Sequence, residues 1–159
     1  MTVPDGKRTP LQVGKPFTTP ITGHEVWIAK TKEILLSVAA ERDYAPEKGS
    51  LLAVREGQKA RIAAKGYRFN HVNVSRCGGY FCCDDWQANS KIVIGSIRTG
   101  KTAELCESRA SRSREPNTHP HAYLTPDLKW VIFNSDRSGF PHVYAASVTS
   151  EMLKRVDET

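Results

Sequence analysis

The chain has 159 residues, the length of one ordinary domain, and its 23 basic and 17 acidic residues give a net charge of +6. It contains no apolar run of about 18 residues, which excludes an ordinary membrane-spanning helix, and its first residues lack the apolar centre of a secretory signal. The positive charge favours acidic partners such as nucleic acid, anionic lipid or an acidic small molecule. An ordinary basic surface accounts for the charge equally well.

The predicted elements are short, and almost all of them are strands. Residues 1–22 hold four prolines and two glycines and form an extended, turn-rich leading segment. Turn signals such as Gly78-Gly79 and Ser138-Gly139 separate the β-favouring runs that follow, which indicates an all-β fold. No convincing amphipathic helix is found, and the best candidate covers residues 150–156, with Ser150 as a candidate cap. The predicted strands cover residues 33–38, 51–54, 61–64, 71–74, 80–83, 91–97, 130–133 and 142–146.

The cysteines carry a weaker signal. Cys77, Cys82, Cys83 and Cys106 form no Cys-x-x-Cys pair, and the adjacent Cys82 and Cys83 face opposite sides of a strand. We interpret the four as buried, reduced thiols rather than as metal ligands. Reduced thiols fit a cytoplasmic or otherwise reducing compartment.

A repeat organises the chain. The segment from His71 to Phe81 aligns with the segment that begins 50 residues later at His121, and a third copy begins 47 residues earlier at His24. A repeat of this length with about four strands is typical of a β-propeller blade. We expect one domain over residues 1–159, with blades at about 23–66, 67–108 and 118–149. Three blades cannot bury their first and last faces, so we expect part of a larger propeller, or closure by self-association.

The histidines are the main candidates for a functional site. On a strand, His119 and His121 would face one side with Pro120 facing away, and His71 would join them from the neighbouring blade. Three imidazoles make a site for a divalent ion such as Zn, Cu, Fe, Ni or Mn. Alternatively, the histidines cap strand starts by bonding backbone carbonyls. His24 is either a fourth ligand or a metal-free general base.

Other side chains have both a functional and a structural interpretation. Arg137 would grip a substrate carboxylate or belong to a salt-bridged turn. Trp27, Trp86 and Trp130 would stack on a bound ligand. Trp130 aligns with Tyr80 and is expected in the core, which leaves Trp27 as the candidate nearer to the site. Three further features have structural interpretations that we favour: Asp84 and Asp85 in a turn at a strand end, His142 as structural or exposed, and the arginine run 109–114 as a solvated loop.

At these residues the chain resembles the oligogalacturonate lyase family, whose members are seven-bladed propellers with TolB-like repeats. The matching segments are residues 23–27, residues 71–85, and Thr118-His119-Pro120-His121 running on to Tyr144. The resemblance covers nearly all of the chain but only the C-terminal portion of a typical family member.

The resemblance implies a cofactor, residue roles and a reaction. It makes His71, His119 and His121 the ligands of a manganese ion and His24 the base. It implies β-elimination on short, unsaturated oligogalacturonides during pectin degradation, with an acidic oligosaccharide as partner. One position departs from the family, because Pro116 stands where a glutamine ligand is expected. Glu115, Asn117 or water would have to replace that glutamine.

Two other function classes compete with the lyase. A non-catalytic, TolB-like binding or scaffold module needs no metal, and it predicts that His71, His119 and His121 lie apart or turn toward backbone carbonyls. Nucleic-acid binding would suit the positive charge, but the sequence has no stacking array or recognised module, so we expect no nucleic-acid partner and no membrane partner.

Overall fold

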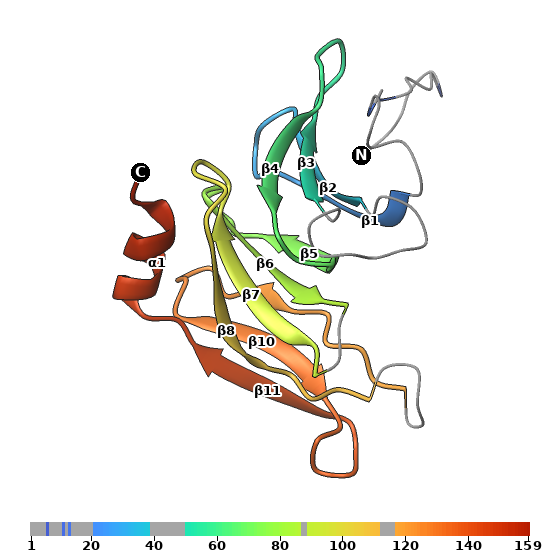
Figure 1. Cartoon of the computed structure of the whole chain (residues 1–159), viewed down its shortest axis with the longest axis vertical. Helices are drawn as coiled ribbons and strands as arrows, with labels where there is room; N and C mark the ends of the chain where they lie inside the picture. Colours follow the sequence, from blue (N-terminus) through green and yellow to red (C-terminus); the bar gives the residue numbers. More distant parts are fainter. Residues whose placement is uncertain are drawn as a thin grey trace.

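The computed structural model describes residues 6, 11, 13, 21–38, 50–86, 89–111 and 117–159. These residues form eleven strands and one helix, which confirms the all-β prediction (Figure 1). In chain order the elements are β1 (Ile21–Trp27), β2 (Ile34–Val38), β3 (Ser50–Val54), β4 (Arg61–Lys65), β5 (Phe69–Val74), β6 (Tyr80–Asp85), β7 (Lys91–Ser96), β8 (Thr102–Glu107), β9 (Tyr123–Leu124), β10 (Trp130–Ser135), β11 (His142–Ser147) and α1 (Ser150–Asp157).

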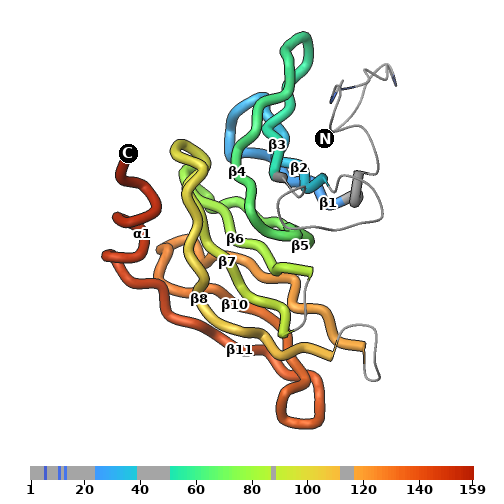
Figure 2. Tube along the Cα trace, in the orientation of Figure 1, coloured from blue at the N-terminus to red at the C-terminus, as the bar shows by residue number. Residues whose placement is uncertain are grey.

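The strands form three antiparallel sheets that follow one another along the chain. The first sheet has the order β1-β2-β3-β4, the second β5-β6-β7-β8, and the third β9-β10-β11. The trace passes through them in succession from blue to red (Figure 2). β5 contacts both β1 and β9, so the first strands of the three sheets lie next to one another.

The hydrogen bonds of the turn after each first strand repeat with the predicted offsets. The amide of Ser75 donates to the carbonyl of Tyr80, and the amide of Thr125 donates to that of Trp130, in both cases at 2.9 Å. The amide of Ile28 makes the equivalent bond to Glu33 at 3.0 Å. Three turns built in the same way put His24, His71 and His121 at equivalent places, as the sequence alignment proposed.

Apolar side chains fill the two spaces between the sheets. Leu35 and Leu51 of the first sheet pack with Phe81 of the second, and Cys82 of the second packs with Val131 of the third. These side chains are 0% exposed. Successive side chains along a strand face opposite sides of the sheet, so the second sheet sends side chains into both spaces. The second sheet therefore lies between the other two.

The C-terminal helix α1 closes one edge of the second sheet. It contacts β7 and β8, and its Val156 is buried in the same cluster as Ile92 and Ile94. The helix cap is Thr149 rather than the predicted Ser150, because the Thr149 hydroxyl accepts the amide of Met152 at 3.1 Å. Among the residues that the structure describes, no helical segment has the length and apolarity needed to cross a bilayer.

Two burial predictions fail. Trp130, expected in the core, is 44% exposed, because it lies on the outer face of the third sheet. Cys77, expected to be buried, is exposed in the turn before β6, whereas Cys82 and Cys83 are buried as predicted.

Candidate metal centre

Each repeat-equivalent histidine lies where the first strand of its sheet is interrupted. The pairing of β5 with β6 shifts between Phe69 and Val72, so that Asn70 and His71 together face Asp84. The pairing of β1 with β2 also shifts, between Ile21 and Glu25, so that residues 22–24 together face Ser37. A bulge re-aims the side chain that it contains, and bulges are common beside functional sites.

The His119–His121 segment is not the regular strand that the sequence predicted. Residues 117–122 have no strand structure, and β9 begins only at Tyr123. His121 has a left-handed backbone with φ of +44°, which cannot continue an extended strand, and Pro120 has no amide hydrogen to donate to a sheet. The amide of Asn134 donates to the Pro120 carbonyl at 2.8 Å and so holds the segment beside β10.

The three predicted ligands nevertheless come together. His71, His119 and His121 each offer a ring nitrogen, and these atoms all lie within 4.8 Å of one another. The ring centroid of His71 is 3.8 Å from that of His121 and 5.4 Å from that of His119. Three nitrogen donors at this spacing can hold a divalent metal ion. The scaffold hypothesis predicted that these rings lie apart or turn toward backbone carbonyls, and the structure contradicts the first of these two alternatives.

His24 borders this cluster. Its ring centroid lies 4.5 Å from that of His71, with the two rings edge to face. Burial lowers the pKa of His24 below its ordinary value, and the neighbouring His71 lowers it further. The same two causes lower the pKa of His121. Both rings are therefore neutral near pH 7, the form in which imidazole binds a metal ion or accepts a proton.

Asp84 lies at the site, although the sequence favoured a structural interpretation over that of a channel acid. It was interpreted as part of a turn, but it lies in β6 and is 0% exposed. Its carboxylate accepts the His71 amide at 3.1 Å and lies 2.9 Å from Nδ1 of the same histidine. A carboxylate on Nδ1 fixes the tautomer with the proton there, which leaves the Nε2 lone pair for a metal ion.

The repeat contained a signal for this position. Ser37, Asp84 and Asn134 are equivalent by the offsets of 47 and 50, and all three meet the interrupted strand. Ser37 donates its hydroxyl to the His24 carbonyl at 3.3 Å, and Asn134 donates its backbone amide to the Pro120 carbonyl. A polar residue opposite the interruption is therefore a shared feature, and only the second sheet uses a carboxylate there.

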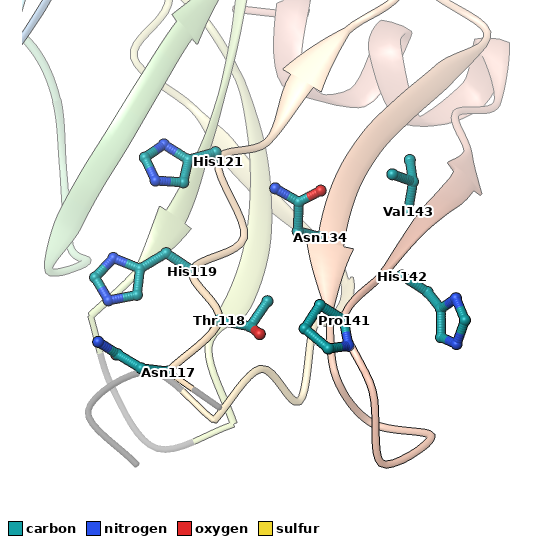
Figure 3. Close-up of a pocket in the computed structure, with 8 residues that line it drawn as sticks. All are labelled: Asn117, Thr118, His119, His121, Asn134, Pro141, His142 and Val143. Atoms are coloured by element: carbon teal, nitrogen blue, oxygen red, sulfur yellow. The ribbon is translucent and has the colours of Figure 1, made fainter. Parts of the chain in front are cut away.

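An open cavity adjoins the histidines. It has a volume of about 690 Å³, and Figure 3 shows His119 and His121 on one side of it and His142 on the other. Asn117 lies next to His119 in this view. Asn117, one of the proposed replacements for the family's glutamine ligand, lines the cavity. The other proposed residue, Glu115, and Pro116 itself lie outside the described residues. The remaining lining residues are Thr118, Asn134, Pro141 and Val143.

The tryptophan beside the histidines is Trp86. Its ring centroid lies 5.5 Å from that of His119. Trp27, the predicted candidate, lies beyond the bulge of β1, where it pairs with Ile34. Trp27 is 58% exposed and lines a second cavity, whose lining residues do not include the histidines. The structure therefore does not bring Trp27 to the cluster.

Arg137 also lies away from the cluster and is used within the fold. Its Nε donates to the carbonyl of Ser108 at 3.2 Å, and its Nη2 donates to the same carbonyl at 2.8 Å. The guanidinium also lies 4.9 Å from the ring centroid of Tyr144. These contacts tie the end of β8 to the third sheet. Arg137 is not among the residues that line the histidine cavity.

The predicted arginine loop lies only partly within the described residues. Arg109 is exposed, and its Nε lies 3.4 Å from a carboxylate oxygen of Glu107. Arg112 and Arg114 lie outside the described residues. His142 is exposed at the start of β11, which agrees with its interpretation, although it also lines the histidine cavity.

Comparison with known proteins points to one enzyme family. An oligogalacturonide lyase of Pectobacterium atrosepticum is 33% identical to the chain over 81 residues, which cover 48% of this chain and 20% of that enzyme. An oligogalacturonate lyase of Dickeya dadantii is 32% identical over 81 residues, with the same coverage. The chain is related to the oligogalacturonate lyases. No protein-family model matches it.

Solved structures agree on the fold. An oligogalacturonate lyase in complex with manganese superposes with a TM-score of 0.69 at 20% identity, over 82% of this chain and 36% of the lyase. TolB from Acinetobacter baumannii superposes with a TM-score of 0.59 at 18% identity, over 80% of this chain and 30% of TolB. The three sheets are thus blades of a TolB-like β-propeller. The chain spans about a third of the lyase it superposes on, and the sequence match spans a fifth of its relatives.

Proposed function

We propose that the chain carries the metal centre of an oligogalacturonate lyase, a manganese-dependent enzyme that cleaves short oligogalacturonides by β-elimination in pectin degradation. The observation that carries this proposal is the convergence of His71, His119 and His121, with nitrogens within 4.8 Å of one another. The family relationship of the matched segment and the manganese in the structurally similar lyase support the choice of reaction and metal.

The donor set fits such an ion. His71, His119 and His121 would hold it, and Asp84 orients His71 through Nδ1. Paired histidine and carboxylate groups of this kind are a common feature of metal sites in proteins. A bound divalent ion would stabilise the negative charge that develops on the substrate carboxylate when the neighbouring carbon loses its proton.

His24 is the proposed general base. Galacturonate carries its carboxylate beside the C5 hydrogen, and a neutral imidazole can accept that proton. The C5–H electrons then form the C4–C5 double bond, and the C4–O bond breaks, so that the C4 oxygen leaves with its electron pair. The products are an unsaturated uronate and a shortened oligosaccharide. The position of His24, 4.5 Å from His71 between ring centroids, would put the base beside the held carboxylate.

The cavity beside the histidines suits a polar substrate. Asn117, Thr118 and Asn134 present amide and hydroxyl groups that can bond sugar hydroxyls. The net charge of +6 attracts an acidic oligosaccharide at long range. Trp86, at the edge of His119, is the better placed aromatic residue for stacking on a sugar ring. Contacts of Trp27 and Arg137 with substrate stay predictions that the geometry does not favour.

The direct test measures ultraviolet absorbance of the unsaturated uronate. The purified chain, and a longer form that restores the length of its relatives, are incubated with short oligogalacturonides plus Mn²⁺ or plus chelator. We expect absorbance to rise only with Mn²⁺. His71→Ala should lower the rate about a thousandfold or more, since it removes a ligand of the ion. Lys154→Ala, at an exposed residue of α1 that lies outside the cluster and does not line the cavity, should retain activity. Equal rates with Mn²⁺ and with chelator would refute the proposal.

A further inference from the structure

The amide side chain of Asn70 lies within the hydrogen-bond network of the metal centre, although Asn70 is not one of the three ligands. The residue is buried and precedes His71 in the bulge of β5. Its Nδ2 donates to Oδ2 of Asp84 at 3.3 Å and lies 2.9 Å from Nδ1 of His71. Because Oδ1 of Asp84 faces the same Nδ1 at 2.9 Å, both oxygens of the carboxylate are engaged.

The position of one proton decides how this network works. Oδ1 of Asp84 and Nδ1 of His71 can approach to 2.9 Å only with a hydrogen between them, and a bond to a carboxylate is stronger than a bond between neutral groups. The proton therefore lies on Nδ1, and the Asn70 amide donates to Oδ2. If that amide were turned round, its oxygen would repel the carboxylate. Asn70 thus holds Oδ2 and keeps Oδ1 directed at His71.

The backbone of Asn70 is held by the neighbour of Asp84 on β6. The amide of Asn70 donates to Sγ of Cys83 at 3.2 Å, and the Cys83 thiol donates to the carbonyl of Asp84 at 3.2 Å. The amide of His71 donates to Oδ1 of Asp84 at 3.1 Å. Two side chains of β6 therefore satisfy the two amides of the bulge, and this fixes the Asn70 side chain beside Asp84.

The repeat separates this arrangement from a general requirement of the fold. By the offsets of 47 and 50, the residues equivalent to Asn70 are Gly23 and Pro120, whose side chains form no hydrogen bonds. The first strand of the first sheet is also bulged, so a bulge at this place does not need an asparagine. Among the three sheets, the second alone combines an asparagine before the histidine with a carboxylate opposite it.

We propose that Asn70 is a positioning residue of the metal centre: it holds Asp84 so that Nδ1 of His71 keeps its proton and Nε2 is left for the ion. The inference rests on the proposed metal centre and deepens it. Every bond of the network joins residues of the chain, so the orientation of His71 is set before an ion binds. Ligands that are already oriented bind more tightly, because less freedom is lost on binding.

A double-mutant cycle tests whether Asn70 acts through Asp84. Isothermal titration calorimetry measures Mn²⁺ binding by the full chain. Asn70→Ala should weaken binding about tenfold, because Asp84 loses a hydrogen bond to its charged group. Asn70→Leu keeps the volume of the side chain but cannot donate, so it should weaken binding as much. Combined with Asp84→Asn, Asn70→Ala should have no further effect, because the carboxylate that it holds is gone. Asn73→Ala, at a residue of β5 that pairs with Cys82 beyond the bulge, is the matched control and should bind as wild type.

The metal-free chain provides a second readout. Long-range ¹⁵N–¹H correlation spectra of histidine rings distinguish the two tautomers, and the His71→Ala spectrum identifies the signals of His71. Wild type should carry the His71 proton on Nδ1. In Asn70→Ala and Asn70→Leu this proton should exchange with water about tenfold faster, because the carboxylate that accepts it is held less firmly. Circular dichroism verifies the fold, and either Asn70 variant suffices if the other fails to fold.

Three results would overturn the inference: wild-type Mn²⁺ affinity in Asn70→Ala, affinity restored in Asn70→Leu, or losses that add in the double variant. A wild-type chain that binds no Mn²⁺ would instead refute the proposed metal centre. The metal-free spectra would then decide the role of Asn70. A His71 ring protonated on Nε2, or an Nδ1 proton that exchanges equally fast in wild type and in the Asn70 variants, would count against it.

Discussion

One carboxylate oxygen of Asp84 lies 2.9 Å from Nδ1 of His71 and 3.1 Å from the backbone nitrogen of the same residue. A single buried side chain thus orients the imidazole and satisfies the amide that the bulge of β5 takes out of the ladder. The bulge in β5 directs His71 toward the other histidines. The Asp84 carboxylate stabilises this bulge and also fixes the tautomer of the His71 ring, so backbone shape and metal binding depend on the same group.

Asp84→Asn should therefore weaken Mn²⁺ binding by about 10- to 100-fold, because the amide keeps the shape of the side chain but removes its charge. Isothermal titration calorimetry measures this directly. Asp85→Asn is the matched control, since Asp85 is adjacent and 2% exposed, but its carboxylate accepts the amide of Arg68. Equal loss of affinity in both variants would mean that Asp84 acts only through general stability.

Replacing His24 should separate binding from chemistry. His24→Gln removes the proposed base, so turnover should fall by about 100- to 10,000-fold while Mn²⁺ affinity stays close to that of wild type. Steady-state kinetics at saturating Mn²⁺, together with a metal titration, measure both quantities. A large loss of metal affinity would instead identify His24 as a fourth ligand, which was the alternative interpretation of the sequence.

The packing of the second sheet predicts a large effect at Gly95. A β-carbon at this position would lie 2.4 Å from Cζ of Phe81 and 2.9 Å from the carbonyl oxygen of Lys101. Phe81 is 0% exposed and cannot move without disturbing the core. Gly95→Ala should lower the free energy of unfolding by about 1–3 kcal/mol in urea denaturation. At Gly79 the nearest atom would be 3.7 Å away, so Gly79→Ala should cost clearly less.

The docking of α1 should depend on pH through Asp157. Its carboxylate accepts the Ser96 hydroxyl at 2.7 Å and Nε of Arg98 at 3.3 Å, and these bonds hold the pKa of Asp157 below its ordinary value. The stabilisation is present above the unfolded-state pKa and is lost as pH falls through the folded-state pKa. Urea midpoints at decreasing pH should therefore fall more steeply in wild type than in Asp157→Asn. Parallel slopes would show that this carboxylate contributes nothing.

The repeat and the turns were predictable because short sequence patterns, the apolar runs and the glycine and proline residues between them, specify both. Hydrophobic runs between glycine and proline signals located most strands, and the offsets of 47 and 50 residues put His24, His71 and His121 at equivalent places ahead of equivalent turns. β8 was missed because Thr102–Glu107 breaks the alternation of a strand at Leu105 and Cys106 and carries two glutamates, and only Ala103 is buried. Such a pattern resembles a loop when it is seen without its partner strand.

The backbone irregularities were not predictable from composition or spacing. A regular strand was assumed for His119 and His121, whereas the structure uses a left-handed residue there and bulges at His24 and His71. The role of Asp84 follows from the bulge, so it was missed together with the bulge. The side of the sheet on which Trp27 lies was not predictable either, because adjacent strand residues face opposite sides and a shift of one residue in register exchanges them.

The central claim is that three imidazoles hold one metal ion, and pulsed electron paramagnetic resonance of Mn²⁺ bound to the chain tests it most directly. The account predicts nitrogen couplings from three histidines, a decrease when His71, His119 or His121 is replaced by alanine, and an unchanged spectrum for His142→Ala. A Mn²⁺ signal without histidine nitrogen couplings, or one that is identical in His71→Ala, would contradict it.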